Sequence, residues 1–245
     1  MFKESFINNK KVFISDLIPE LTHFFTTRES FLKTKDENFE EQVRLNKTDI
    51  CNYLKISSEN LISAKQIHSA NIQIAEAGMN FYPETDAIIL TNNEQAACLN
   101  FADCTPVILY DKGNNIAAVV HAGWRGTAQS IAQKTVLKMQ KEFNSKPKNI
   151  SAVIGPAISM CCYNVGEEVY TKLKETVSDF NGLYNIKDNN IYIDLKGINK
   201  KQLSDAGVNA VDVCPFCTCC NNDLFFSYRK ENGTTNRHNA IIKLK

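Results

Sequence analysis

The stretch 115–143, NIAAVVHAGWRGTAQSIAQKTVLKMQKEF, carries the strongest structural signal in this sequence. Its first seven residues form a nearly continuous apolar run, as expected for a strand that is covered on both faces. Apolar residues then recur at roughly helical spacing, at Ile131, Val136, Met139 and Phe143. Thr127 has a side chain suited to the N-cap of that helix. A buried strand that runs directly into a helix predicts a fold in which helices cover a sheet.

Weaker signals of the same kind extend to both sides of this stretch. Short apolar runs predict further strands at 11–15, 21–26, 86–90, 96–101, 107–111, 150–155, 192–195 and 208–213, followed by a terminal section that ends in NAIIKL (239–244). Helices are predicted at 33–54, 167–177 and 196–206. Some strands are consecutive and others are separated by helices, and no Gly-x-Gly-x-x-Gly or phosphate-loop signature occurs. The pattern predicts an α+β fold with mixed sheets, with residues 1–245 in a single domain.

Composition and charge exclude several classes of protein. With 43% hydrophobic and 22% charged residues, the chain has the composition of an ordinary globular protein. Its formal net charge is +1 and its basic residues are scattered, whereas a nucleic-acid surface usually shows a basic stripe or a pI above about 9. No apolar run suits a signal peptide or reaches the roughly 18 residues of a membrane span. We expect a soluble cytoplasmic protein, a monomer or a homodimer, with no nucleic-acid or membrane partner.

The nine cysteines are read as reduced thiols, because disulfides are rare in a reducing cytoplasm and the count is odd. A dense group occurs near the C-terminus, at Cys214, Cys217, Cys219 and Cys220, and Cys161 with Cys162 could complete a second metal site with it. A single C-x-x-C motif is only a moderately specific signal for zinc. We therefore favour reduced, partly buried thiols over a structural zinc site here.

A more specific combination involves two of the four histidines. His121 is the last residue of the predicted buried strand and faces the glycine-flanked loop AGWRG, a place where α/β proteins often carry functional groups. His68 lies before another predicted strand, and Cys104 lies in a short turn between two strands. Two imidazoles and one thiolate suit zinc or copper, and three protein ligands leave a coordination position open, as in catalytic sites. The long spacing between the three residues adds little specificity of its own.

Seven motifs occur together and in order: QIHSANI (66–72), DAIIL (86–90), NFADCTPVILYD (100–111), AVVHAGWRGT (118–127), IGPAIS (154–159), CYNVGEEV (162–169) and FFSYRKENGTTNRHNAII (225–242). From about His23 onwards the sequence thus resembles the laccase-domain family, also called the multicopper polyphenol oxidase-like or peptidoglycan editing factor family. The resemblance implies a four-layer α/β/β/α sandwich. It also implies a catalytic metal ion, Zn²⁺ or Cu²⁺, bound by His68, Cys104 and His121.

The same resemblance implies purine nucleoside chemistry. Expected reactions are the cleavage of adenosine, inosine or methylthioadenosine with phosphate, and the deamination of adenosine, so the expected partners are a purine nucleoside and phosphate. A metal ion suits deamination because it lowers the pKa of a bound water toward about 7. For phosphorolysis, the ion or Arg125 could orient phosphate. The guanidinium of Arg125, near a predicted helix N-terminus, could bind an anion bidentately, although a surface salt bridge is an equally good interpretation. Arg28, Arg229 and Arg237 are weaker candidates for substrate binding.

Four other functions can be weighed against this one. A four-copper laccase mechanism is excluded, because a type-1 copper and a trinuclear cluster need many more histidines than four, mostly in His-x-His pairs. A mononuclear copper oxidase remains conceivable but is disfavoured. Cys104 and His121 could instead act as nucleophile and base of a hydrolase on an amide or peptidoglycan-related substrate. A non-enzymatic metal- or nucleotide-binding module is the weakest alternative, because it would leave the open coordination position unused.

Overall fold

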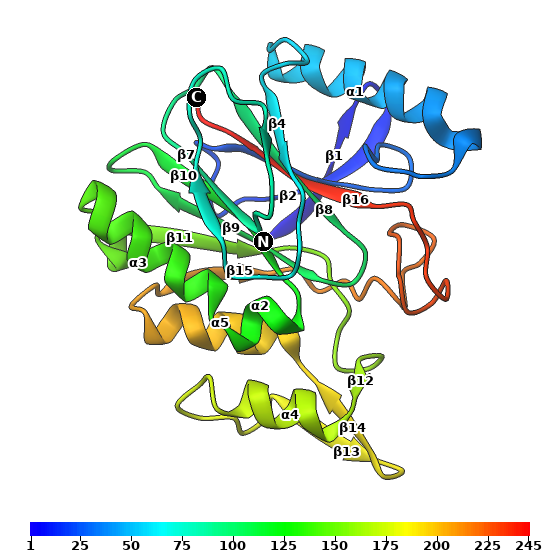
Figure 1. Cartoon of the computed structure of the whole chain (residues 1–245), viewed down its shortest axis with the longest axis vertical. Coiled ribbons are helices and arrows are strands. Elements are labelled where there is room, and N and C mark those ends of the chain that lie inside the picture. The colour runs from blue at the N-terminus through cyan, green and yellow to red at the C-terminus, as the bar shows by residue number, and fades with distance from the viewer.

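The computed structural model describes residues 1–245 and contains two large sheets that face each other (Figure 1). The first is a seven-stranded mixed sheet in the order β1-β2-β3-β16-β8-β4-β6. Its strands are β1 (Phe2–Ile7), β2 (Lys10–Ser15), β3 (Thr22–Thr26), β16 (His238–Lys243), β8 (Ala96–Phe101), β4 (Leu61–Ala64) and β6 (Phe81–Tyr82). Strand β16 pairs antiparallel with both β3 and β8, which precede it by more than a hundred residues.

The second sheet has six strands in the order β15-β11-β9-β10-β7-β5, and a small third sheet has the order β12-β14-β13. The six strands are β15 (Ala210–Val213), β11 (Ile150–Ile154), β9 (Thr105–Asp111), β10 (Ile116–Ala122), β7 (Ala87–Leu90) and β5 (Ile72–Ile74). The third sheet consists of β12 (Asn164–Val165), β14 (Asn190–Ile193) and β13 (Tyr184–Lys187). Every residue of β9 and β10 is buried, as the apolar runs predict.

Five α-helices accompany these sheets: α1 (Glu40–Leu54), α2 (Trp124–Ala128), α3 (Ile131–Phe143), α4 (Glu167–Lys174) and α5 (Leu195–Asp205). Two short 3-10 helices lie at Glu37–Phe39 and Pro147–Asn149. Helix α1 packs Ile50 and Leu54 on the outer face of the seven-stranded sheet, and α3 packs Val136 and Met139 on the outer face of the six-stranded sheet. No helix is both long and apolar enough to cross a bilayer.

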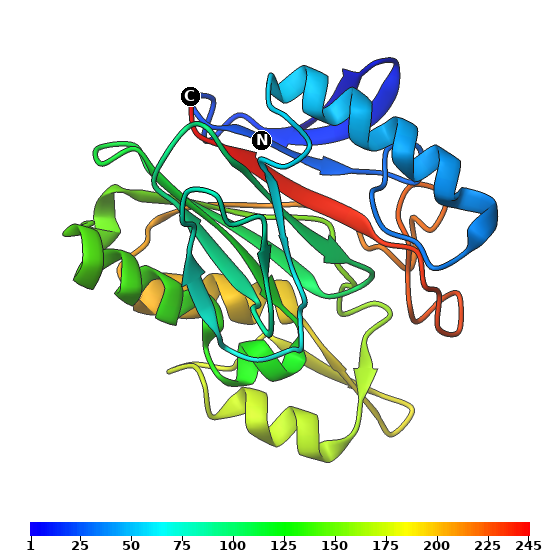
Figure 2. The same cartoon turned by 45° about the horizontal axis from the view of Figure 1, so that its top comes forward.

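The main core lies between the two large sheets. Phe25 and Leu99 of the first sheet and Ile108 and Val119 of the second belong to one cluster of buried residues and are inaccessible to solvent. With α1 outside one sheet and α3 and α5 outside the other, the layers follow the order α/β/β/α (Figure 2). This confirms the expected mixed-sheet, four-layer sandwich. The small third sheet and α4 lie at one end, around a separate apolar cluster.

One predicted helix is interrupted in the structure. The helix expected from Thr127 onwards is two helices, because Ser130 adopts a left-handed conformation with φ of 57° between α2 and α3. Thr127 is not an N-cap; it lies inside α2, fully buried, and its hydroxyl accepts a hydrogen bond from Asn199. Gly123 occupies the N-cap position of α2.

Candidate metal centre

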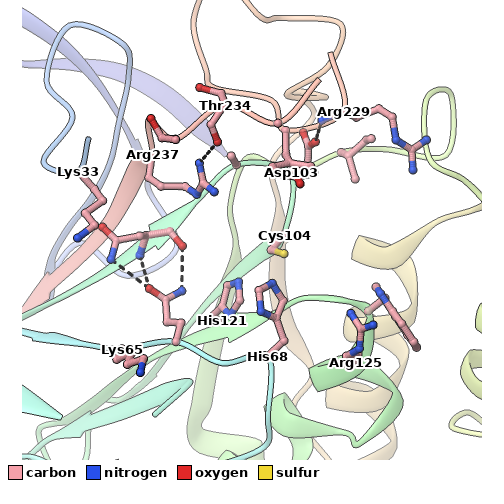
Figure 3. A pocket seen from close by; sticks show the side chains of 18 of the residues that line it. Lys33, Lys65, His68, Asp103, Cys104, His121, Arg125, Arg229, Thr234 and Arg237 are labelled. Atoms are coloured by element: carbon pink, nitrogen blue, oxygen red, sulfur yellow. Dashed lines mark hydrogen bonds between the residues drawn. The ribbon is translucent and has the colours of Figure 1, made fainter. Parts of the chain in front are cut away.

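His68, Cys104 and His121 lie close together at one end of the two facing sheets (Figure 3). Their ligand atoms all lie within 4.8 Å of one another. His121 lies near the end of β10, where it pairs with Pro106 of β9. Cys104 lies in the turn where the chain leaves β8 of one sheet and enters β9 of the other. His68 follows β4 in a left-handed conformation with φ of 63°.

A buried carboxylate that the sequence analysis missed, Asp86, orients both histidines. His121 Nδ1 lies 2.8 Å from Asp86 Oδ1, and the backbone N–H of His68 donates to the same oxygen at 3.0 Å. The other oxygen accepts from the backbone N–H and the hydroxyl of Ser69 at 2.8 and 2.7 Å. Because Nδ1 of His121 donates to Asp86, Nε2 is left as the metal-binding nitrogen, the arrangement usual for metal-ligating histidines.

The charges of this group favour a cation. Burial raises the pKa of the Cys104 thiol, but the positive charge of His121 and hydrogen bonds with both histidines lower it to about 6. Burial lowers the pKa of His121, but the Cys104 thiolate and Asp86 raise it to about 9. Cys104 is therefore a thiolate at neutral pH, which is the form that binds metals. A metal ion would displace the proton of His121, so metal binding should weaken as the pH falls.

The packing around the thiolate leaves room for the ligands only because residue 123 is glycine. A Cβ at Gly123 would lie 2.9 Å from Cys104 Sγ and 3.0 Å from His68 Cδ2. The distance to Cys104 Sγ is shorter than a Cβ contact normally is, and the distance to His68 Cδ2 lies at the lower limit of such contacts. The donor set of two imidazoles and one thiolate, with ligand atoms within 4.8 Å of one another, suits a transition-metal ion such as zinc or copper.

Gly123→Ala is therefore expected to weaken zinc binding by about 10- to 100-fold, the range seen when a group that positions a ligand is disturbed. Its φ of −68° is compatible with alanine, so the backbone itself should tolerate the change. Zinc affinity measured by competition with a chromophoric chelator would check this. Gly166→Ala is the matched control, because nothing lies within 4 Å of a Cβ there. Equal zinc affinity in the two variants would contradict the steric argument.

The three candidate ligands lie in a cavity of about 940 Å³ with a strongly basic lining. Six cationic side chains line it: Lys33, Lys35, Lys65, Arg125, Arg229 and Arg237. Asp103 is the one carboxylate among the lining residues, and both its oxygens are occupied, one by the Thr218 hydroxyl and one by the backbone N–H of Arg229. The cavity therefore suits an anionic ligand beside the candidate metal centre.

Of the four arginines predicted to bind substrate, Arg237 lines the cavity, and the other three occupy different environments. Arg125 is exposed, lies 4.3 Å over the Trp124 ring and has no ion pair or side-chain hydrogen bond within the protein. Arg229 also lines the cavity, but its guanidinium donates to Asn164 and to the carbonyl of Cys162. Arg28 does not line the cavity, since it pairs with Glu231 and donates to a backbone carbonyl. Among the three, the geometry leaves Arg125 free for a ligand.

Sequence reasoning also missed Lys33 and Lys65, which line the cavity with no ion pair. In Figure 3 these two lysines and Arg237 lie on one side of the ligands and Arg125 lies on the other. Lys65 comes three residues before His68, so its proximity in sequence was a usable signal. Lys33 comes from a distant loop, and no pattern in the sequence connects it with the site.

Known proteins resemble this chain in sequence and in fold. Residues 25–245 match the family described as multi-copper polyphenol oxidoreductase laccase, and the chain belongs to that family. A relative from Bacteroides thetaiotaomicron, named purine nucleoside phosphorylase, is 33% identical over 233 residues, covering 86% of each chain. The crystal structure of Bacillus licheniformis YfiH has a TM-score of 0.88 at 29% identity and covers 96% of each chain. That of YlmD from Geobacillus stearothermophilus has a TM-score of 0.85 at 28% identity, covering 94% of each.

Proposed function

We propose that this chain is a metal-dependent purine nucleoside phosphorylase that cleaves adenosine, inosine or methylthioadenosine with phosphate. The observation that carries the proposal is one cavity that contains both a His₂Cys ligand set and a lining of six cations with a single, fully engaged carboxylate. The relatives named purine nucleoside phosphorylase support it. Adenosine deaminase activity is proposed as a second reaction of the same cavity.

Each group has a part in this reaction. His68, Cys104 and His121 would hold the ion, with Asp86 orienting the ring of His121 and the backbone of His68. A zinc ion there would supply Lewis acidity toward an oxygen of a reactant. Arg125 binds phosphate through its planar fork of donors, which suits a tetrahedral oxyanion better than a point charge does. The stacked Trp124 ring limits the motion of that guanidinium and so lowers the entropy lost on binding.

Arg125→Lys is expected to raise the KM for phosphate by about 10- to 150-fold, because a bidentate charged contact contributes about 1.5–3 kcal/mol. Zinc content should stay unchanged, and deamination of adenosine, which needs no phosphate, should change much less. Chromatographic assays with each nucleoside, with and without phosphate, would measure both reactions. Arg28→Lys, outside the cavity, serves as the control. Equal losses in phosphorolysis and deamination would show that Arg125 does not bind phosphate.

One observation favours a second candidate function. Without a metal ion, Cys104 is a thiolate beside a protonated His121, the charge state of a cysteine hydrolase pair. On this alternative the chain would hydrolyse an amide or a peptidoglycan-related substrate. Chelation separates the two functions. Metal-free protein that cleaves such a substrate at full rate would favour the hydrolase, whereas activity toward nucleosides that returns with zinc would favour the phosphorylase.

A further inference from the structure

Four cysteine side chains outside the candidate metal centre converge on a second point. They are Cys161, Cys162, Cys217 and Cys220, and their sulfur atoms all lie within 4.8 Å of one another. We refer to them as the four-cysteine cluster. The sequence places six cysteines near this region, and the structure selects four, since Cys214 is fully buried elsewhere and Cys219 is not part of the cluster.

Two loops supply these thiols, and strand pairing holds the loops together. Strands β11 and β15 run parallel, and their pairing continues beyond the strand ends as a bridge between Ala157 and Cys217. The backbone N–H of Thr218 donates to the Ala157 carbonyl at 3.1 Å. The cluster therefore joins two loops that lie about sixty residues apart in the sequence. Main-chain hydrogen bonds already hold these loops side by side.

The spacing of the sulfur atoms matches tetrahedral coordination of a single ion. Cys220 Sγ lies 3.6 Å from Cys161 Sγ and 3.4 Å from Cys162 Sγ. Four thiolates at about 2.3 Å from one zinc ion stand about 3.8 Å apart, so zinc would fit with shifts of less than about 1 Å. The nine cysteines are all free thiols, and no sulfur pair is joined as a disulfide.

The backbone around Cys217 favours a thiolate. The backbone N–H of Ser159 donates to Cys217 Sγ at 3.4 Å. An N–H donor beside the sulfur stabilises the charged form of a thiol, and the thiolate is the form that binds metal ions.

We propose that the four-cysteine cluster binds a second zinc ion in a closed, structural site. Four protein ligands leave no position for a substrate, which distinguishes this site from the three-ligand centre with His68 and His121. Thiolates alone, without carboxylate or imidazole, select zinc over magnesium, calcium or manganese. This inference does not depend on the proposed phosphorylase activity.

The ion would stabilise one wall of the basic cavity. Tyr163, which lines the cavity, follows Cys162 directly, and Arg229 donates to the Cys162 carbonyl at 3.2 Å. On the other loop, the hydroxyl of Thr218 donates to Asp103 at 2.6 Å, and Asp103 adjoins the metal ligand Cys104. Loss of the second ion is therefore expected to loosen the Cys104 turn and the Tyr163 wall together.

The test is the zinc content of protein purified under reducing conditions, measured by inductively coupled plasma mass spectrometry. Wild-type protein should contain about two zinc ions per chain, and Cys220→Ser should contain about one. Cys219→Ser, a change in the same loop outside the cluster, is the matched control and should retain both. Cys104→Ala should also fall to about one ion, retained by the four-cysteine cluster.

A second measurement covers the case in which Cys220→Ser does not fold. Cys104→Ala reconstituted with Co²⁺ keeps the cluster intact and should show intense sulfur-to-cobalt charge-transfer bands together with the visible bands of a tetrahedral four-thiolate site. The proposal would be overturned by a Cys104→Ala variant that holds no zinc and shows no such bands. It would also be overturned if Cys220→Ser kept the wild-type zinc content, or if the zinc-free protein purified under reducing conditions carried a disulfide between Cys162 and Cys220.

Discussion

Cys104→Ala is expected to remove the metal ion from the His68–Cys104–His121 site and nearly all turnover of purine nucleosides. The two imidazoles that remain bind zinc far less tightly than a set with a thiolate, and they lose the negative charge beside His121. Removing a group that only orients a metal ligand lowers metal affinity by about 10- to 100-fold. Removing a ligand itself should lower the zinc affinity by more than that. Zinc content and phosphorolysis measured on the same preparation would check the result.

The control for this variant is Cys98→Ala. Cys98 is buried in β8, faces α1 and lies in a different apolar cluster, so the change should lower stability without affecting zinc or turnover. Full phosphorolysis by Cys104→Ala with no zinc at this centre would contradict the metal-dependent mechanism. In that case Arg125 and the cavity lysines, without a metal ion, would be the groups that act on phosphate.

Asp86→Asn is expected to lower the free energy of unfolding by about 3–5 kcal/mol, the range for removing one partner of a buried charged pair. Both oxygens of Asp86 accept hydrogen bonds, from His121 and the His68 backbone on one side and from Ser69 on the other. Asparagine has one acceptor oxygen, so its NH₂ group would face an N–H donor in either orientation. Zinc affinity should fall as well, by about 10- to 100-fold, because His121 loses the carboxylate that orients it.

Denaturant unfolding at several pH values would measure this effect. The hydrogen bonds from His121 and Ser69 outweigh burial and lower the pKa of Asp86 to about 2. A carboxylate with a lowered pKa stabilises the folded state above its ordinary pKa, and this contribution disappears as the pH falls through the folded-state value. Wild-type protein should therefore lose this stability between about pH 4 and 2, whereas Asp86→Asn should lack it throughout. Asp111→Asn, a buried aspartate that accepts hydrogen bonds within a turn distant from the ligands, is the control.

The sequence predicted most of the elements that build the core, because their signals are local. The run 96–101 coincides with β8, and the run 115–121 differs from β10 by one residue at each end. Strand β1 was missed because it is an edge strand with several exposed polar residues and no apolar run. The interruption at Ser130 depends on a single left-handed residue, which hydrophobic periodicity does not register.

The candidate site was likewise predicted only in part. The ligand triad was proposed through motifs and a family resemblance, and the structure places its three side chains together. Asp86 was not found, because its role depends on contact with a histidine 35 residues away, and its own surroundings in sequence suggest only the start of a strand. The choice of four thiols among six neighbouring cysteines likewise required the pairing of β11 with β15.

The central position of β16 in the seven-stranded sheet has a consequence for biosynthesis. Residues 238–243 insert between β3 and β8, so both of those strands leave the ribosome long before their shared neighbour exists. Until translation reaches Lys243, the facing edges of these two strands expose unpaired backbone N–H and C=O groups, which readily pair with other chains. The nascent polypeptide should therefore need protection by chaperones during elongation, and folding should be slow because its contacts are long-range.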